Sequence, residues 1–249
     1  KPLVVEFASV ANTVAQSGSV EFARALYKSF DRILERYHLA PGTSGGYFNH
    51  QFDFFKFLGH ELFVTLFAAL IREGRWEVVK ELLDEGIYVR NAEGSKADLV
   101  RFDYVSEYIK LLDYRNRRLN LRRLSLHSDI LKERHTEGDL AEVAPHGSFV
   151  EADYFLAMRS LKDDEHDGPF YSAWRAWSVL HTPPGGLRFL VEAKSKKMAE
   201  RLCGTLGLTG VEQLRNRIAA TRTYLSRLFR DGFWSAPPFH YQPDEIGSQ

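Results

Sequence analysis

A cluster of arginines is the densest local charge in the chain. Arg115, Arg117, Arg118, Arg122 and Arg123 stand close together, and Arg115, Arg118 and Arg122 have the spacing of one helical face. Guanidinium groups present fork-shaped donors that match phosphate and carboxylate oxygens. Arg115, Arg118, Arg122 and Arg123 are therefore candidates for binding nucleic acid, another phosphate ligand or an acidic partner. The alternative is a solvated face that only keeps the protein soluble.

A possible catalytic pair lies inside this cluster. Arg122 and His127 are spaced as Arg-x4-His, which resembles the active-site motif of the HEPN family of helical, metal-independent ribonucleases. The resemblance implies that His127 is a general acid or base and that Arg122 stabilises the charged phosphorane. It covers six residues, and Arg123 replaces the polar residue that usually follows the arginine. A ribonuclease is thus an alternative function.

Aromatic residues are crowded ahead of a proline-glycine break. Trp174 and Trp177 follow Phe170 and Tyr171. Such a group can anchor a protein partner or stack on bases, which makes Trp174 and Trp177 candidates for partner binding. Filling the core is the alternative.

A polar pair, His60 and Glu61, interrupts an otherwise apolar helix. Buried polar groups need hydrogen-bond partners. We interpret the pair as a structural lock within the core, with a pocket-lining role as the alternative.

Other chemistry has little support. Glu192 and Lys194 look like the Glu-x-Lys half of a PD-(D/E)xK nuclease, but their surroundings have helical rather than strand spacing. The single Cys203 excludes a cysteine-based zinc site within one copy of the chain, and the acidic run at 163–167 lacks the pattern of a calcium loop. No phosphate-binding loop, dinucleotide fingerprint or nucleophile elbow appears. We expect no cofactor and no metal.

The stretch 52–89 predicts two helices folded against each other through Glu73, Gly74 and Arg75. The first is apolar around nearly its whole circumference, from Phe54 and Phe55 to Ile71, and should be buried on almost every side. The second is amphipathic. A central helix wrapped by others is the expected architecture.

Helical spacing continues over most of the chain. It predicts helices over 99–114 and 115–137, and capping-box spacing at 148–151 and 209–212 predicts two further starts, with a helix over 149–161. Almost no period-two alternation is present. The sequence therefore predicts an all-α, compact multi-helix domain of antiparallel helix pairs around a central apolar helix, with an irregular helical-repeat arrangement as a variant.

Composition limits the remaining choices. The chain has 249 residues, 44% of them hydrophobic, and 33 basic side chains balance 33 acidic ones. We expect one domain over 1–249, with sub-boundaries at 145–148 and 162–169. The apolar run is too short to span a membrane, no secretory pattern opens the chain, and the cysteine usage fits a reducing compartment. We interpret the chain as a cytoplasmic piece of a larger protein.

These features favour a non-catalytic helical interaction, sensor or regulatory module of a multidomain bacterial-type protein. Its expected partner is an attached or separate protein domain. The alternatives are the ribonuclease using Arg122 and His127 and a nucleic-acid-binding module using the arginine face. No membrane contact is expected, and the sequence predicts no oligomeric state.

Overall fold

The structure is a computed structural model that describes residues 2–40, 46–90, 97–161, 173–229 and 245–248. The α-helices are α1 (Pro2–Ser17), α2 (Val20–Tyr27), α3 (Ser29–Leu34), α4 (Asp53–Arg72), α5 (Trp76–Asp84), α6 (Lys110–Arg118), α7 (Leu126–Thr136), α8 (Asp139–Val143), α9 (His146–Ser160), α10 (Arg188–Glu192), α11 (Lys196–Leu206) and α12 (Val211–Leu228). Short 3-10 helices are η1 (Glu35–Tyr37), η2 (Asn49–Phe52), η3 (Phe102–Val105) and η4 (Trp177–His181). Over the described residues, the all-α prediction is confirmed.

Some sequence predictions fall outside the described residues. These are the sub-boundary at 162–169, the acidic run at 163–167, and the aromatic residues Phe170 and Tyr171. The other sub-boundary, 145–148, coincides with the start of α9.

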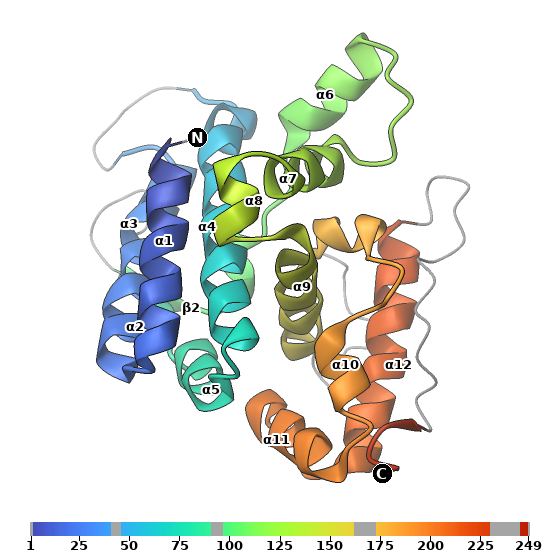
Figure 1. The fold of residues 1–249 in the computed structure, drawn as a ribbon. Coiled ribbons are helices and arrows are strands. Elements are labelled where there is room, and N and C mark those ends of the chain that lie inside the picture. Colours follow the sequence, from blue (N-terminus) through green and yellow to red (C-terminus); the bar gives the residue numbers. More distant parts are fainter. Residues whose placement is uncertain (1, 41–45, 91–96, 162–172, 230–244, 249) are drawn as a thin grey trace.

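Helix α4 is the central helix of the fold (Figure 1). It packs against α1, α3, α5 and α9, and every residue from 59 to 71 is buried. Its first turns differ from the prediction, because Phe54 and Phe55 are 68% and 37% exposed. Asp53 and Lys56 take the inward face there, so the two rings lie on other sides of the helix.

The predicted hairpin of helices is confirmed. Gly74 has a φ of 67°, which favours glycine, and the Arg75 N–H donates to the Leu70 carbonyl at 2.9 Å. Helix α5 then buries Trp76 and Leu82.

A second buried helix, α9, lies beside α4 and completes the centre of the molecule. Buried apolar side chains from Val4 to Ile246 join into one core around this pair. Close packing also fixes Gly59 on α4, since a Cβ atom there would overlap the hydroxyl of Tyr37. That hydroxyl donates to the Val105 carbonyl at 3.1 Å, which ties η1 to η3.

The single helix predicted over 115–137 is wrong. Helix α6 ends at Arg118, and Asn120 and Arg122 have left-handed φ values of 47° and 53°. Helix α7 begins after Ser125, whose hydroxyl accepts from the Ser128 N–H at 3.1 Å as an N-cap. Arg122 therefore does not share a helical face with Arg115.

The helix predicted over 99–114 is also wrong in its first half. Strand β1 (Ile87–Arg90) pairs antiparallel with β2 (Ala97–Val100), with Ile87 opposite Val100. Side chains of β1 alternate between buried and exposed. Four residues are too few for this alternation to stand out in a sequence.

Both predicted capping boxes are wrong in detail. Helix α9 starts at His146 after Pro145, so Ser148 lies inside it, and Glu151 accepts from the Arg188 N–H instead. Helix α12 has Gly210 at its N-cap. Proline and glycine set these starts in place of a hydroxyl cap.

One segment, Asn49–Arg72, is long and apolar enough to cross a membrane, and 78% of its most apolar window is buried inside the protein. It includes α4, so its apolar character is that of a core helix, as expected from the sequence and consistent with a soluble protein. Helix α10 likewise places Glu192 on a helix, in line with the helical spacing around it.

Candidate functional site

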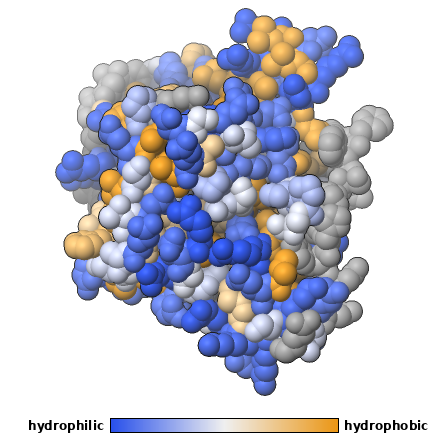
Figure 2. All heavy atoms as spheres, in the orientation of Figure 1, coloured by the Kyte–Doolittle hydropathy of each residue, from blue (hydrophilic) through white to orange (hydrophobic). Residues whose placement is uncertain are grey.

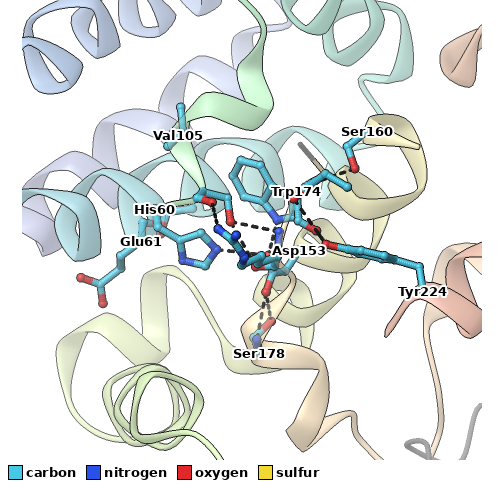
Figure 3. Close-up of polar contacts among 12 residues, drawn as sticks. His60, Glu61, Val105, Asp153, Ser160, Trp174, Ser178 and Tyr224 are labelled. Atoms are coloured by element: carbon cyan, nitrogen blue, oxygen red, sulfur yellow. Dashed lines mark hydrogen bonds and ion pairs between the residues drawn. The ribbon is translucent and has the colours of Figure 1, made fainter. Parts of the chain in front are cut away.

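A buried carboxylate, Asp153 on α9, lies at the centre of a polar network (Figure 3). Its Oδ1 accepts from the Trp174 indole N–H at 2.7 Å and lies 3.4 Å from Nε2 of His60. Its Oδ2 accepts from the N–H and the hydroxyl of Ser178, at 2.9 and 2.7 Å. Asp153 is fully buried, so these donors are what make its burial tolerable.

A second lock joins α4 to α7. The Glu61 carboxylate accepts two hydrogen bonds from the Arg134 guanidinium, at 2.6 and 2.9 Å, and lies 3.4 Å from Nε2 of His135. Burial alone would raise the pKa of Glu61, but the contacts with His135 and Arg134 outweigh it and hold the pKa below its ordinary value. His60 thus connects α4 to Asp153 on α9, and Glu61 connects α4 to Arg134 on α7.

The backbone around Trp174 is fixed by further hydrogen bonds. Its N–H donates to the Ser160 hydroxyl at 3.0 Å, and its carbonyl accepts from the Tyr224 hydroxyl at 3.2 Å. Arg175 and Trp177 follow directly and line two separate hollows. The buried network therefore positions a wall of each hollow.

The first hollow, of about 300 Å³, lies at the foot of α6. We name it the charged hollow because, beside His50, it is lined by three carboxylates and three lysine or arginine side chains: Asp53, Asp103, Glu107, Lys56, Lys110 and Arg175. The Lys56 side chain is 1% exposed, and its ammonium lies 2.6 Å from the Glu107 carboxylate and donates to Oδ1 of Asn49 at 2.8 Å. Charges buried around a hollow are typical of a binding site, because burial otherwise disfavours them.

Asp53 connects this hollow to α6. Its Oδ2 accepts from the Leu111 N–H at 2.7 Å, in the first turn of that helix. Its Oδ1 is buried and has no hydrogen-bond partner among the described residues. Burial raises the pKa of the Asp53 carboxyl, an effect reduced by the Leu111 N–H and by Lys56.

The second hollow, of about 330 Å³, is named the histidine hollow after His127. His127 is 4% exposed, and neither ring nitrogen has a hydrogen-bond partner in the described part of the chain. Burial, with a smaller effect of His60, lowers the pKa of His127 well below its ordinary value. Its imidazole is therefore neutral near pH 7. Trp177 and Arg123 line the same hollow, and Tyr108 lines both hollows.

The two residues of the proposed catalytic motif have different surroundings. Arg122 is exposed on the loop between α6 and α7 and does not line the histidine hollow. Arg123 does line it, with its Nε 3.7 Å from Asp129. The motif straddles a loop and the first turn of α7.

The two tryptophans have different environments. Trp174 is fully buried and stacks on His60 with ring centroids 5.3 Å apart, so it fills the core. Trp177 is half-buried beside His127, at a centroid distance of 5.7 Å. Only Trp177 lies where a ligand entering the histidine hollow could reach it.

The remaining arginine candidates belong to a projecting segment, residues 110–124, which we name the α6 arm. Helix α6 projects from one end of the molecule and has no buried residue (Figure 1). Apolar surface gathers on this projection with hydrophilic atoms beside it (Figure 2). The arm carries Leu111, Tyr114, Leu119, Leu121 and Leu124, each between 39% and 45% exposed, together with Arg115, Arg117, Arg118, Arg122 and Arg123.

One side chain keeps the arm folded. Asn116 on α6 donates its amide N–H to the Arg123 carbonyl at 2.6 Å and accepts from the Arg123 N–H at 3.1 Å. The loop is thereby closed against the helix, and its leucines stay outside.

Sequence reasoning missed the charged hollow. Asp53 and Lys56 were visible only as interruptions of an apolar stretch, although two charges one turn apart at the start of a core helix are a usable signal. Glu107 and Arg175 carry no local signal, because only the fold brings them to α4.

Comparisons of the chain with protein-family models, with curated proteins and with solved structures found no match. Among the described residues, no group of three or more histidine, cysteine or acidic side chains could hold a metal ion.

Proposed function

We propose that the chain is a non-catalytic interaction module that binds an acidic protein partner through the α6 arm. The observation that carries this proposal is that α6 has no buried residue and yet presents Leu111 and Tyr114 to solvent. An isolated nine-residue helix is marginal in water, so its tertiary surroundings usually decide its stability. A contiguous exposed apolar surface is typical of a partner-binding site.

The charge of the arm selects the partner. Residues 110–124 include six basic side chains and one acid, Asp113, in a chain whose overall formal charge is zero. A partner with acidic side chains around apolar anchors complements this surface, since rim charges steer association while buried apolar groups supply affinity.

Nucleic acid is the alternative ligand for the same arginines. Binding to phosphates would weaken steeply with rising salt through counterion release. It would not require Leu119, Leu121 or Leu124, which favour a protein partner. Arg118→Glu should weaken either kind of binding, whereas the uncharged truncation Leu121→Ala should weaken only protein binding.

The ribonuclease alternative rests on His127, whose neutral imidazole faces a hollow that also contains an arginine, Arg123. It needs both Arg122 and His127 near the reacting phosphate. We expect the purified chain to cleave no RNA in the presence of chelator. Cleavage that disappears in both Arg122→Ala and His127→Ala, with the fold retained, would establish the enzyme instead.

We also propose that the module acts in the cytoplasm, as part of a larger bacterial-type protein. The single buried Cys203 supports a reducing compartment. A neighbouring domain of the same polypeptide would satisfy the proposal as well as a separate protein.

Photo-crosslinking in cells of the source organism tests the proposal. A photoreactive amino acid replaces Leu121 in the full chain, and the matched control carries it at Leu3, which is 78% exposed on α1. We expect a protein adduct from position 121 alone, with an acidic surface on the captured protein or domain. Arg115→Glu with Arg118→Glu should reduce the adduct about tenfold or more. Adducts to nucleic acid, or equal adducts from both positions, would overturn the proposal.

A further inference from the structure

The charged hollow holds as many carboxylates as lysine and arginine side chains, and part of this charge is already neutralised. Lys56 pairs with Glu107 at 2.6 Å, and Asp103 pairs with Arg101 at 3.2 Å. A balanced set of separated charges favours neither a simple anion nor a simple cation. It favours a ligand that carries both charges at once.

Three groups remain available to such a ligand. Arg175 and Lys110 have no carboxylate partner among the described residues, and the Lys110 ammonium lies 5.5 Å from the centre of the Tyr114 ring. Oδ1 of Asp53 accepts no hydrogen bond from these residues. Asp53 is only 2% exposed. A buried carboxylate oxygen without a donor is costly, so a donor supplied by a ligand would be favourable.

Arg175 is held for this role by its neighbours. Its N–H donates to the Ser106 hydroxyl at 3.1 Å, and its Nη1 donates to the Ser106 carbonyl at 3.3 Å. Among the described residues, the rest of the guanidinium fork is left for a planar acceptor such as a carboxylate.

We propose that the charged hollow binds a small zwitterion of the α-amino acid class. Its carboxylate is bound by Arg175 and Lys110, and its ammonium donates to Oδ1 of Asp53. The hollow of about 300 Å³ lies at the lower end of the range for small-molecule sites, which suits a ligand of this size. Tyr104 and Tyr108 in the lining offer ring surface to the ligand side chain.

Ligand binding also acts on the α6 arm. Lys110 is the first residue of α6, so one of the three ligand contacts belongs to the arm. A second contact, Asp53 on α4, accepts from the Leu111 N–H through its Oδ2 and so is bonded directly to the arm. A ligand that orders Asp53 and Lys110 stabilises the direction of α6. This regulatory half of the proposal rests on the proposed function of the arm.

Calorimetric titration of the full chain tests the binding half. The probes are the free α-amino acids, the matched amines without a carboxylate, the matched acids without an amine, and inorganic phosphate. We expect at least one amino acid to bind, and its two truncated analogues to bind about tenfold more weakly or worse. Arg175→Ala should weaken binding by a similar factor, and Arg175→Lys should restore part of it. The matched control Arg188→Ala, at an exposed arginine of α10, should leave the affinity unchanged.

Three results would overturn the binding half: no amino acid binds, phosphate binds as tightly as any amino acid, or Arg175→Ala binds as the wild type does. Circular dichroism and thermal melting of each variant establish that it is folded, and Asp53→Asn gives a second, independent loss if Arg175→Ala is unstable.

Amide hydrogen exchange tests the regulatory half. We expect the amides of 110–118 to exchange severalfold more slowly when the amino acid is bound, and those of α1 to be unchanged. Binding without slower exchange in α6 would overturn the regulatory half and leave the site standing. Failure of arm crosslinking with binding retained would overturn the proposed function alone.

Discussion

Asp153 and Asp53 are both buried carboxylates, and they differ in how many hydrogen-bond donors reach them. Asp153 lies in the core, and both of its oxygens accept hydrogen bonds from Trp174 and Ser178. Asp53 lies beside a hollow, and one of its oxygens accepts none among the described residues. A carboxylate whose two oxygens both accept hydrogen bonds stabilises the fold, whereas one with a free oxygen beside a cavity can bind a ligand. The difference separates the interior from the site.

The largest expected effect on stability is that of removing the fully hydrogen-bonded carboxylate, Asp153. Asp153→Ala leaves the Trp174 indole N–H and the Ser178 N–H buried without an acceptor. We expect a loss of about 3–5 kcal/mol in the free energy of unfolding, measured in urea. Asp53→Ala removes one helix-end contact and should cost about 1 kcal/mol. Equal losses would erase the distinction between the two carboxylates.

A loss of the same size is expected from the apolar interior. Phe67 on α4 is fully buried and packs against Phe63 with ring centroids 4.8 Å apart. Phe67→Ala should cost about 3–5 kcal/mol by chemical denaturation, because it opens a cavity. Phe54 on the same helix is the matched control, and its truncation should change stability by less than about 0.5 kcal/mol. If Phe67→Ala left the free energy of unfolding unchanged but abolished binding to a partner, α4 would be a docking surface instead of a core helix.

An intermediate effect concerns the pH dependence of stability. The folded pKa of His127 lies below its unfolded value, so the unfolded chain binds the proton first as pH falls. Stability contributed by neutral His127 is fully present above about pH 6.5 and is lost as pH falls below that value. We expect the wild type to lose about 1 kcal/mol more than His127→Phe between pH 6.5 and 5.5.

His146 must be considered in the same measurement. Burial lowers its pKa to about 4, so it adds a loss of the same sign that both proteins share. An identical slope in the wild type and in His127→Phe would show that His127 takes up its proton equally in the folded and unfolded chains, contrary to its burial.

The smallest expected effect on stability is in the α6 arm. Leu121 is 39% exposed, and Leu121→Ala should change the free energy of unfolding by less than about 0.5 kcal/mol. The same change should weaken binding to the proposed partner about tenfold, measured by titration calorimetry once that partner is identified. A large loss of stability with unchanged binding would place the leucine in the folding unit and not in an interface.

Local patterns account for what could be predicted from the sequence. The apolar circumference of 62–71 and the Gly74 turn depend on neighbours a few residues away, and both predictions are confirmed. The sequence did not predict the end of α6. The loop there contains Asn120 and Arg122 in left-handed conformations and is held by hydrogen bonds from the Asn116 side chain, which apolar spacing cannot reveal.

Long-range pairs account for what could not be predicted. Asp153 meets His60, and Glu61 meets Arg134, only after α4, α7 and α9 have packed together. The charged hollow draws on α4, η3 and Arg175, which lie far apart in the chain. The spacing of neighbouring residues carries no information about contacts between residues so far apart in the sequence.

The two hydrogen bonds between Asn116 and Arg123 have a kinetic consequence for the arm. Because the loop after α6 is already closed onto the helix, the entropy of ordering these residues is lost during folding and not when another molecule arrives. The loop therefore presents its leucines in one arrangement relative to α6, so the encounter of the arm with an acidic surface is limited by diffusion and orientation. The association rate should then depend on ionic strength far more than on temperature-sensitive rearrangement of the arm.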